Sequence, residues 1–300
     1  MSSRRTPRTF SGSRPRLLAG RSFSRRRAAK DPENAQVVAF RVLVWKYWRE
    51  NGRHDLPWRK TKDPYRILVS EIMLQQTQVP RVLGKYKEFL KQFPTVRALA
   101  KASLSDVLKV WSGLGYNRRG KHLQDAAKEI VEKYDRNLKR ALEHKLSGVG
   151  PYTRAAVKAF AFNESGTFIE TNIRAAYIHH FFGISTNVHD REILLILKKA
   201  AEGQDPRKWH WALMDYGAHL KRSGVHNNHK SAHYTKQSKF EGSLRQVRGA
   251  ILRKLQKGSR TENAMRSDLI AFGKRRLEKA LAGLARDGLI AKEKGKWRIT

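Results

Sequence analysis

Apolar side chains recur at helical spacing along most of the chain between residues 34 and 222. In the first such segment Val37, Phe40 and Val44 share one face, and an Asn-Gly pair at 51 and 52 supplies a stop signal. No alternation with a period of two residues occurs before residue 285, so an all-α body is predicted. Further helices are expected at 80–92, 95–101, 103–111, 117–134, 138–145, 151–162, 171–182, 189–203 and 207–221.

The pattern changes after the body. Residues 223–240 are rich in Ser, Asn and Thr and are predicted to form a basic loop or linker. Residues 241–300 show three helical segments, at 242–257, 261–271 and 274–286, followed by two short apolar strands around a Lys-Gly turn. This tail resembles a winged-helix domain with three helices and a small β-hairpin. Contact with DNA is favoured by its charge, and a protein-contact module is the alternative.

Composition limits the partners of the chain. The 300 residues include 63 Lys and Arg and 26 Asp and Glu, which gives a net charge of +37. Nucleic acid is the commonest partner of such a basic chain. No run of 18 apolar residues occurs, so no membrane partner is expected. The chain has no cysteine, which excludes disulfides and thiolate metal sites. A cytoplasmic or nucleoid location is expected, or a nucleus or organelle in a eukaryote.

The first thirty residues carry ten Lys and Arg and no acid. Residues 1–33 are predicted to form a basic, disordered arm that contacts nucleic acid. An organelle transit peptide and an extension without a role are the alternatives.

One carboxylate, Glu71, lies in the segment Ser-Glu-Ile-Met-Leu-Gln-Gln-Thr-Gln at residues 70–78, on a helix that Asp63-Pro64 is predicted to open. Its neighbours on that helix at i−4 and i+3 are Ile67 and Leu74. A carboxylate held against apolar groups resists ionisation, so its pKa should rise and it can donate a proton near neutral pH. A surface glutamate is the alternative interpretation.

Cleavage of a glycosidic bond needs a second carboxylate, because the sugar gains positive charge as the bond breaks. Glu170 follows an apolar pair and opens a predicted helix, so it is the best candidate, with a simple helix cap as the alternative. The turn from Gly148 to Gly150 leads into another helix, where backbone N–H groups can bind a phosphate. An ordinary corner between two helices is the alternative there.

Six blocks in one order carry a family resemblance. Residues 35–222 resemble the helix-hairpin-helix DNA glycosylase superfamily and, within it, the MutY-like adenine glycosylases, which implies a two-lobed body. The blocks are Leu-Pro-Trp-Arg (56–59), Asp-Pro-Tyr (63–65), residues 70–78, Trp-Ser-Gly-Leu-Gly-Tyr (111–116), Gly-Val-Gly-Pro-Tyr-Thr (148–153) and Leu-Met-Asp-Tyr-Gly-Ala (213–218).

The resemblance implies roles for individual residues. Glu71 matches the acid that protonates the base and activates water, and Glu170 matches the anion that stabilises the oxocarbenium ion. Tyr152 and Asn172 match residues that orient these groups. Superfamily members that also cut the strand have a lysine at position 152, which forms a Schiff base, so a tyrosine implies a glycosylase without lyase activity.

Other positions match residues that hold the DNA. Flipping is required because the bond to be cut is inaccessible within a duplex. The resemblance places Trp58, Arg59 and Trp211 in the base pocket, and it places Gln75, Gln76, Tyr116, Gly148, Gly150 and Thr153 in contact with DNA.

The chain departs from the family at four places. The family's four cysteines, which hold an iron–sulfur cluster after residue 218, are absent, so no cluster and no metal are expected. Histidines fill that segment, and a cationic loop is favoured there over a zinc site. Glu170 replaces an aspartate, and Trp211 stands where adenine-specific members place a polar side chain. A winged helix replaces the domain that reads oxidised guanine.

The sequence therefore predicts four segments, at 1–33, 34–222, 223–240 and 241–300. The predicted function is a cofactor-free, monomeric DNA glycosylase that removes a mispaired base from double-stranded DNA, chiefly adenine opposite guanine or 8-oxoguanine. A thymine or uracil mismatch glycosylase is one alternative. A DNA-binding protein without catalysis is the other.

Overall fold

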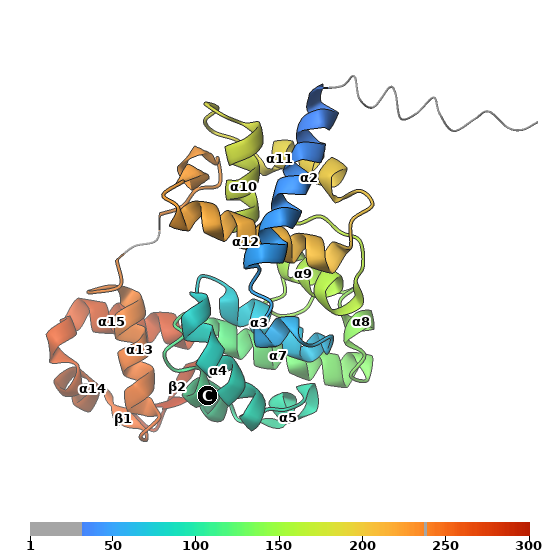
Figure 1. The fold of residues 1–300 in the computed structure, drawn as a ribbon. Coiled ribbons are helices and arrows are strands. Elements are labelled where there is room, and N and C mark those ends of the chain that lie inside the picture. Colours follow the sequence, from blue (N-terminus) through green and yellow to red (C-terminus); the bar gives the residue numbers. More distant parts are fainter. Residues whose placement is uncertain (1–31, 237–238) are drawn as a thin grey trace, which may run out of the picture.

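The computed structural model describes residues 32–236 and 239–300 (Figure 1). All but the last two residues of the predicted basic arm lie outside this part of the chain. No helix of the described residues is long and apolar enough to cross a membrane.

The body is all-α and two-lobed, as predicted. In one lobe α10 packs along α12, and α2 and α11 cover them; in the other α7 packs against α5, α6 and α8 (Figure 1). The first lobe contains α2 (Pro32–Asn51), α10 (Thr171–Phe181), α11 (Asp190–Ala201) and α12 (Pro206–Arg222). The second contains α4 (Val79–Gln92), α5 (Val96–Lys101), α6 (Leu104–Trp111), α7 (Arg118–Tyr134) and α8 (Leu138–Ala141).

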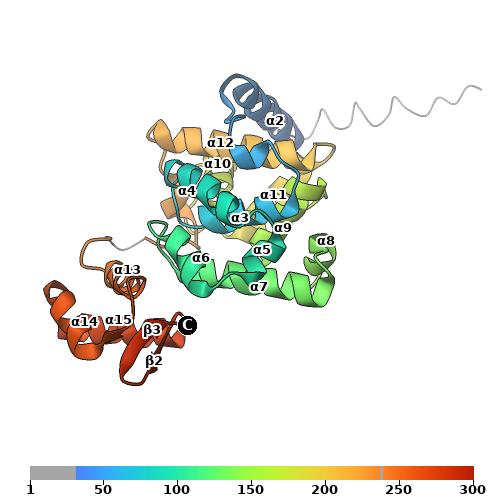
Figure 2. The ribbon, with the colours of Figure 1, turned by 90° about the horizontal axis from the view of Figure 1, so that it is seen from below.

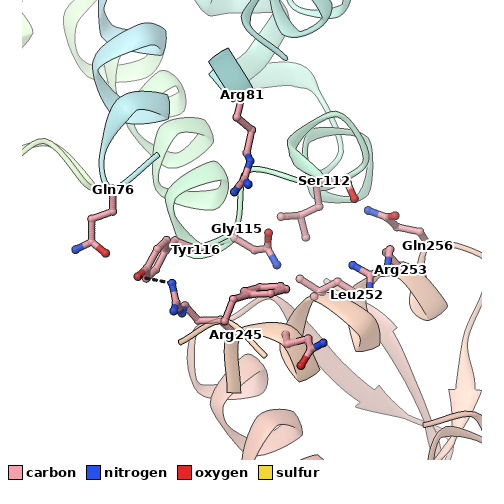
Figure 3. Close-up of a pocket in the computed structure, with 15 residues that line it drawn as sticks. Gln76, Arg81, Ser112, Gly115, Tyr116, Arg245, Leu252, Arg253 and Gln256 are labelled. Atoms are coloured by element: carbon pink, nitrogen blue, oxygen red, sulfur yellow. Dashed lines mark hydrogen bonds between the residues drawn. The ribbon is translucent and has the colours of Figure 1, made fainter. Parts of the chain in front are cut away.

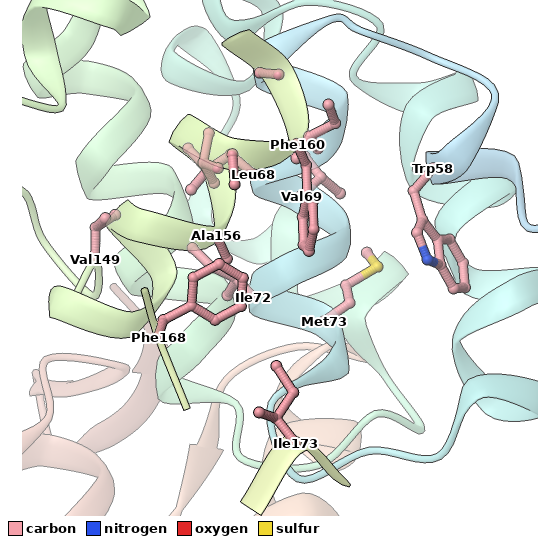
Figure 4. Packing of buried hydrophobic residues seen from close by; sticks show 14 of the residues in the cluster. Trp58, Leu68, Val69, Ile72, Met73, Val149, Ala156, Phe160, Phe168 and Ile173 are labelled. Atoms are coloured by element: carbon pink, nitrogen blue, oxygen red, sulfur yellow. The ribbon is translucent and has the colours of Figure 1, made fainter. Parts of the chain in front are cut away.

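Helix α3 (Pro64–Leu74) lies at the centre of the body and packs against α9 (Pro151–Phe162). Asp63 caps α3 by accepting hydrogen bonds from the backbone of Tyr65 and Arg66, and Pro64 occupies the first turn. Its side chains are buried almost all the way round, against Phe160 and Ala156 of α9 and against Phe168 (Figure 4). Such burial fixes the direction of every side chain on the helix, the carboxylate of Glu71 included.

The C-terminal part has a hydrophobic cluster of its own and lies beside α6 and α7 (Figure 2). Its sheet is antiparallel in the order β1-β3-β2, and Leu104 and Leu108 of α6 join its apolar cluster. Its elements are α13 (Leu244–Leu255), β1 (Arg260–Thr261), α14 (Glu262–Asp268), the 3-10 helix η3 (Ile270–Phe272), α15 (Lys274–Arg286), β2 (Ile290–Glu293) and β3 (Lys296–Ile299).

The structure differs from the predicted pattern in three details. The helix expected at 138–145 ends at Ala141, and β1 is an additional short strand. Within the predicted loop, a 3-10 helix η2 (Asn227–Lys230) packs on α10, and Ser231 forms a bridge with Val188. Ser231 is only 6% exposed, so this stretch packs on the body. The boundaries of the four predicted segments stay a prediction.

Candidate active site

A pocket of about 720 Å³ lies where the end of α3 meets the starts of α9 and α10 and one face of α12. Twelve of the thirteen residues predicted for the site line this pocket. Tyr116, the thirteenth, lines two neighbouring cavities. Side chains separated by up to 153 positions are thus brought together, from Trp58 to Trp211.

Glu71 projects from the third turn of α3 and is 4% exposed. The hydroxyl of Tyr152 donates a hydrogen bond to Glu71 Oε2 at 3.2 Å. The pKa of Glu71 is raised to about 7, chiefly by burial. The hydrogen bond from Tyr152 and the charge of Arg59 lower this pKa, whereas the charge of Glu170 raises it. Glu71 can therefore exist as a protonated acid near neutral pH.

Glu170 is the N-cap of α10 and also lines the pocket, so it is a helix cap and its catalytic role stays a prediction. One carboxylate oxygen accepts hydrogen bonds from the backbone of Asn172 (2.8 Å) and Ile173 (2.9 Å). The other accepts one from Asn172 Nδ2 at 3.2 Å. Burial raises the pKa of Glu170, and these hydrogen bonds oppose that effect. The start of a helix favours the negative form of this carboxylate.

Tyr152, in the first turn of α9, connects the acid to the core. Its ring contacts Phe168 edge to face with centroids 5.4 Å apart. Burial, together with the charges of Glu71 and Glu170, raises the pKa of Tyr152 well above its usual value. The phenol therefore stays protonated and donates to Glu71. The nearest lysine along α9, Lys158, pairs with Glu143 at 2.6 Å.

An ion-pair network that was not predicted from the sequence supports the predicted base pocket. Asp215, 2% exposed, accepts hydrogen bonds from Arg59 (2.7 and 2.9 Å) and from Arg53 (2.6 Å to Nε). Burial alone would raise the pKa of Asp215, and the hydrogen bonds and charges of the two arginines outweigh it, so the pKa is lowered. The Arg59 guanidinium lies over the Trp211 ring at 5.4 Å. The sequence block at 213–218 could have indicated the role of Asp215, because Asp215 is the only charged residue of that block.

The aromatic residues of the predicted base pocket are fixed by packing. Trp58 belongs to η1 (Pro57–Arg59), is 6% exposed and contacts Tyr86 edge to face. Trp211 stacks on Phe160 with centroids 5.6 Å apart. These rings form rigid flat walls of a kind that suits a planar ligand.

The turn before α9 leaves the backbone accessible at the start of the helix. Gly148 has φ +69°, and a Cβ there would lie 2.6 Å from His122 Cβ, so glycine is required by both conformation and space. Gly150 is the N-cap of α9, and a Cβ there would meet nothing within 4 Å. The backbone at Gly150 is thus open to a ligand at the positive end of the helix. Thr153 is buried and accepts a hydrogen bond from Gln75 Nε2 at 3.1 Å.

A second missed residue, Arg119, shapes the segment after α3. Its guanidinium donates to the backbone carbonyls of Ile72 (2.8 Å) and Met73 (3.0 Å) and to the Thr77 hydroxyl (3.0 Å). It thereby satisfies carbonyls that have no partner at the end of a helix. Gln76, just beyond, has a left-handed backbone with φ 54°.

A tight approach of α10 and α12 holds Glu170 and Asn172 in place. A Cβ at Gly217 would lie 2.0 Å from the Asn172 carbonyl oxygen, so Gly217→Ala must push the two helices apart. We expect a loss of roughly 1–3 kcal/mol or more in the free energy of unfolding, measured with urea. Gly84→Ala in α4 is the control: its Cβ would meet nothing within 4 Å, so it should stabilise by about 0.5–1 kcal/mol. Equal stability of the two variants would contradict this role of Gly217.

The segment that follows the body's last helix does not fit an iron–sulfur cluster, because the chain has no thiolate donors. Histidines in and near this segment make other contacts: His219, in the last turn of α12, stacks on Tyr47, and His229 Nδ1 lies 2.6 Å from the carbonyl oxygen of His226. In residues 32–236 and 239–300 no three His, Asp or Glu side chains are placed to share a metal ion.

Comparison with known proteins identifies a matching family. The model of the HhH-GPD superfamily base excision DNA repair protein matches residues 69–202. The adenine DNA glycosylase of Mycolicibacterium smegmatis is 30% identical over 263 residues, which are 81% of this chain and 90% of that protein.

Other relatives are longer than this chain. The adenine DNA glycosylase of Buchnera aphidicola subsp. Baizongia pistaciae is 34% identical over 61% of this chain and 53% of that protein. The human adenine DNA glycosylase is 37% identical over 46% of this chain and 27% of that protein. The chain thus spans about half, or less, of the length of these two relatives. Among solved structures, a thermostable thymine-DNA glycosylase matches with a TM-score of 0.55 and 29% identity, over 63% of this chain and 88% of that one.

Proposed function

Because the chain belongs to the HhH-GPD superfamily of base excision DNA repair proteins and, within it, to the adenine DNA glycosylases, we propose that it excises adenine mispaired with guanine or 8-oxoguanine in double-stranded DNA. The observation that carries the proposal is the pocket in which Glu71 and Glu170, from different helices, face one ligand space beside Tyr152. Flat aromatic walls and an open helix start beside these carboxylates suit an extruded base and its phosphate.

In the proposed reaction Glu71 is the acid. It transfers its proton to the extruded base as the bond between C1′ and the base nitrogen breaks, and the bonding electrons leave with the base. Glu170, held at the start of α10, stabilises the positive charge that develops on the sugar. Water then attacks C1′ and gives its proton to Glu71, which restores the acid and leaves an abasic site.

The proposed enzyme is monofunctional and acts without a metal or cluster. A Schiff base with C1′ would need an amine in the pocket, and position 152 offers a phenol in its place. Tyr152 is hydrogen-bonded to Glu71, so its role is to orient the acid. We therefore expect the strand to remain intact until it is treated with alkali.

A panel of labelled duplexes tests the proposal. Purified protein is incubated with A:8-oxoguanine, A:G, T:G, U:G and A:T duplexes, and each sample is divided into portions with and without alkali. Strand breaks at A:8-oxoguanine and A:G after alkali alone are the expected result. Breaks at T:G or U:G alone would support a thymine or uracil glycosylase and overturn the adenine proposal. Breaks without alkali would overturn the monofunctional assignment, and binding without breaks would leave a DNA-binding protein without catalysis.

The pKa of Glu71 predicts how the rate depends on pH. The reaction needs the protonated form, so the single-turnover rate should fall about tenfold per pH unit once the pH exceeds about 7. Below that pH the rate should level off, and a decline at still lower pH would mark protonation of Glu170. Single-turnover excision measured from pH 5 to 9 checks this prediction. A rate that rises steadily between pH 7 and 9 would contradict the assignment of Glu71 as the acid.

A further inference from the structure

A charged groove separates the body from the C-terminal part, outside the pocket described above. Two adjoining cavities of about 540 and 670 Å³ form it, between the α6–α7 connection on one side and α13 and α15 on the other. Figure 3 shows the smaller of the two. Gln76, Tyr116, Asn117 and Arg245 line both cavities.

The groove and the candidate active site meet at Gln75 and Gln76. Gln76 lines both cavities of the groove and also the pocket that contains Glu71, and Gln75 lines that pocket and the larger of the two cavities. A base extruded into that pocket leaves a gap in the duplex. Gln76 lies at the edge of the pocket, next to the position of that gap. Beyond Gln76, as seen from Glu71, lies the groove. A duplex whose extruded base occupies the pocket therefore has its other strand on the side of the groove.

The charge of the groove fits a sugar–phosphate backbone. Among the described residues that line it, Asp287 is the only carboxylate, and it already pairs with Arg118 (3.2 Å) and Arg248. Exposed Arg253 on α13 and Lys279 on α15 line the groove, and no ion pair with a described acid is found for either. Such cations neutralise phosphates and release counterions when DNA binds.

Contacts with the body hold the wall of the groove in place. Arg245 Nη1 donates a hydrogen bond to the Tyr116 hydroxyl at 2.9 Å, and its guanidinium lies 5.2 Å from the centroid of that ring (Figure 3). Tyr116 and Gln76 both have left-handed backbones, with φ 46° and 54°. Non-glycine residues held in this region are common at ligand sites. Leu104 and Leu108 pack against the C-terminal apolar cluster, so α13 is fixed beside these two residues.

We propose that this groove binds the backbone of the DNA strand opposite the extruded base, with α13 and α15 of the C-terminal part as one wall. The inference rests on the proposed function and assigns to the C-terminal part a share in substrate binding. The strand would lie against Gln76 and Tyr116, with its phosphates near Arg253 and Lys279.

The salt dependence of binding tests the charge argument. The double variant Arg253→Ala/Lys279→Ala should bind an A:8-oxoguanine duplex more weakly, and the slope of log K against log salt should flatten by about 1.8, or about 0.9 for each lost phosphate contact. Lys257→Ala/Lys296→Ala is the matched control, because it removes two exposed cations of the same part that do not line the groove. The excision rate at saturating protein should be unchanged in the control variant. Equal slopes for the two double variants would overturn the proposal.

A cross-link identifies the strand. The natural chain has no cysteine, so Gln256→Cys, at the groove, and Lys296→Cys, outside it, each give one thiol. Both are made in the Glu71→Gln background and mixed with duplexes that carry a disulfide-tethered thiol on either strand near the mispair. Gln256→Cys should cross-link to the strand opposite the adenine, and Lys296→Cys should react far less. Cross-linking of Gln256→Cys to the adenine strand, or to neither strand, would overturn the proposal.

The two proposals fail in different ways. If the wild-type protein releases no adenine but Gln256→Cys still captures the opposite strand, the proposed activity is wrong and the groove is a DNA site. If adenine is released and neither strand is captured, the groove does not bind DNA. A protein contact would then be the remaining role of the C-terminal part.

Discussion

Glu71→Gln should abolish excision while the protein still binds DNA. The amide has nearly the shape of the acid and fits the same buried position beside Tyr152, but it has no proton to transfer to the base. General acid–base catalysis contributes about 10²–10⁴-fold to the rate of a reaction. We therefore expect the single-turnover rate on an A:8-oxoguanine duplex to fall by a factor of at least about 10². The dissociation constant should change little, because no cation is lost.

Glu143→Gln is the matched control for this experiment. Glu143 is exposed, lies outside the pocket and pairs with Lys158. The same chemical change there should leave the excision rate as it is in the wild type. An active Glu71→Gln protein, or an equal loss in both variants, would reject Glu71 as the acid.

Asp215→Ala should give the largest loss of stability among the site variants. Asp215 is the shared partner of Arg59, whose side chain is 5% exposed, and of Arg53, whose side chain is 31% exposed. Removal of one partner from a buried ion pair leaves an uncompensated charge, which costs roughly 3–5 kcal/mol. The free energy of unfolding, from urea denaturation, should fall by that amount. The Arg59 guanidinium should also lose its position over Trp211, so excision should slow in the molecules that remain folded.

Asp55→Ala provides the comparison for Asp215→Ala. Asp55 pairs with Lys60 at 2.9 Å, but its side chain is 98% exposed. A fully exposed pair of this kind contributes little to stability, so the free energy of unfolding should hardly change. If Asp215→Ala were no more destabilising than Asp55→Ala, the network could not be what holds Arg59.

Much of the site was predictable because its signals are local in the sequence. Ile67 and Leu74 around Glu71 indicated a carboxylate among apolar side chains, and Glu71 is buried. Asp63-Pro64 indicated the start of α3, and Asp63 caps it. Gly148 and Gly150 indicated a turn that leads into a helix, and α9 begins directly after Gly150.

The missed features depend on contacts between distant parts of the chain. Arg59 and Asp215 are 156 positions apart, and no periodicity connects them. Arg119 looked like one of many cations on a basic helix, and only the fold brings it to the carbonyls at the end of α3. The groove could not be predicted either, because it depends on where α13 lies relative to Tyr116.

Release of the free base is the most direct measure of the central claim, that Glu71 and Glu170 act on one extruded adenine. The wild-type protein, in excess over an A:8-oxoguanine duplex at pH 7, should liberate one adenine for each abasic site formed, with the strand intact. Chromatography of the free base and a gel of the same sample measure both quantities. Saturated binding with no free adenine released would contradict the account.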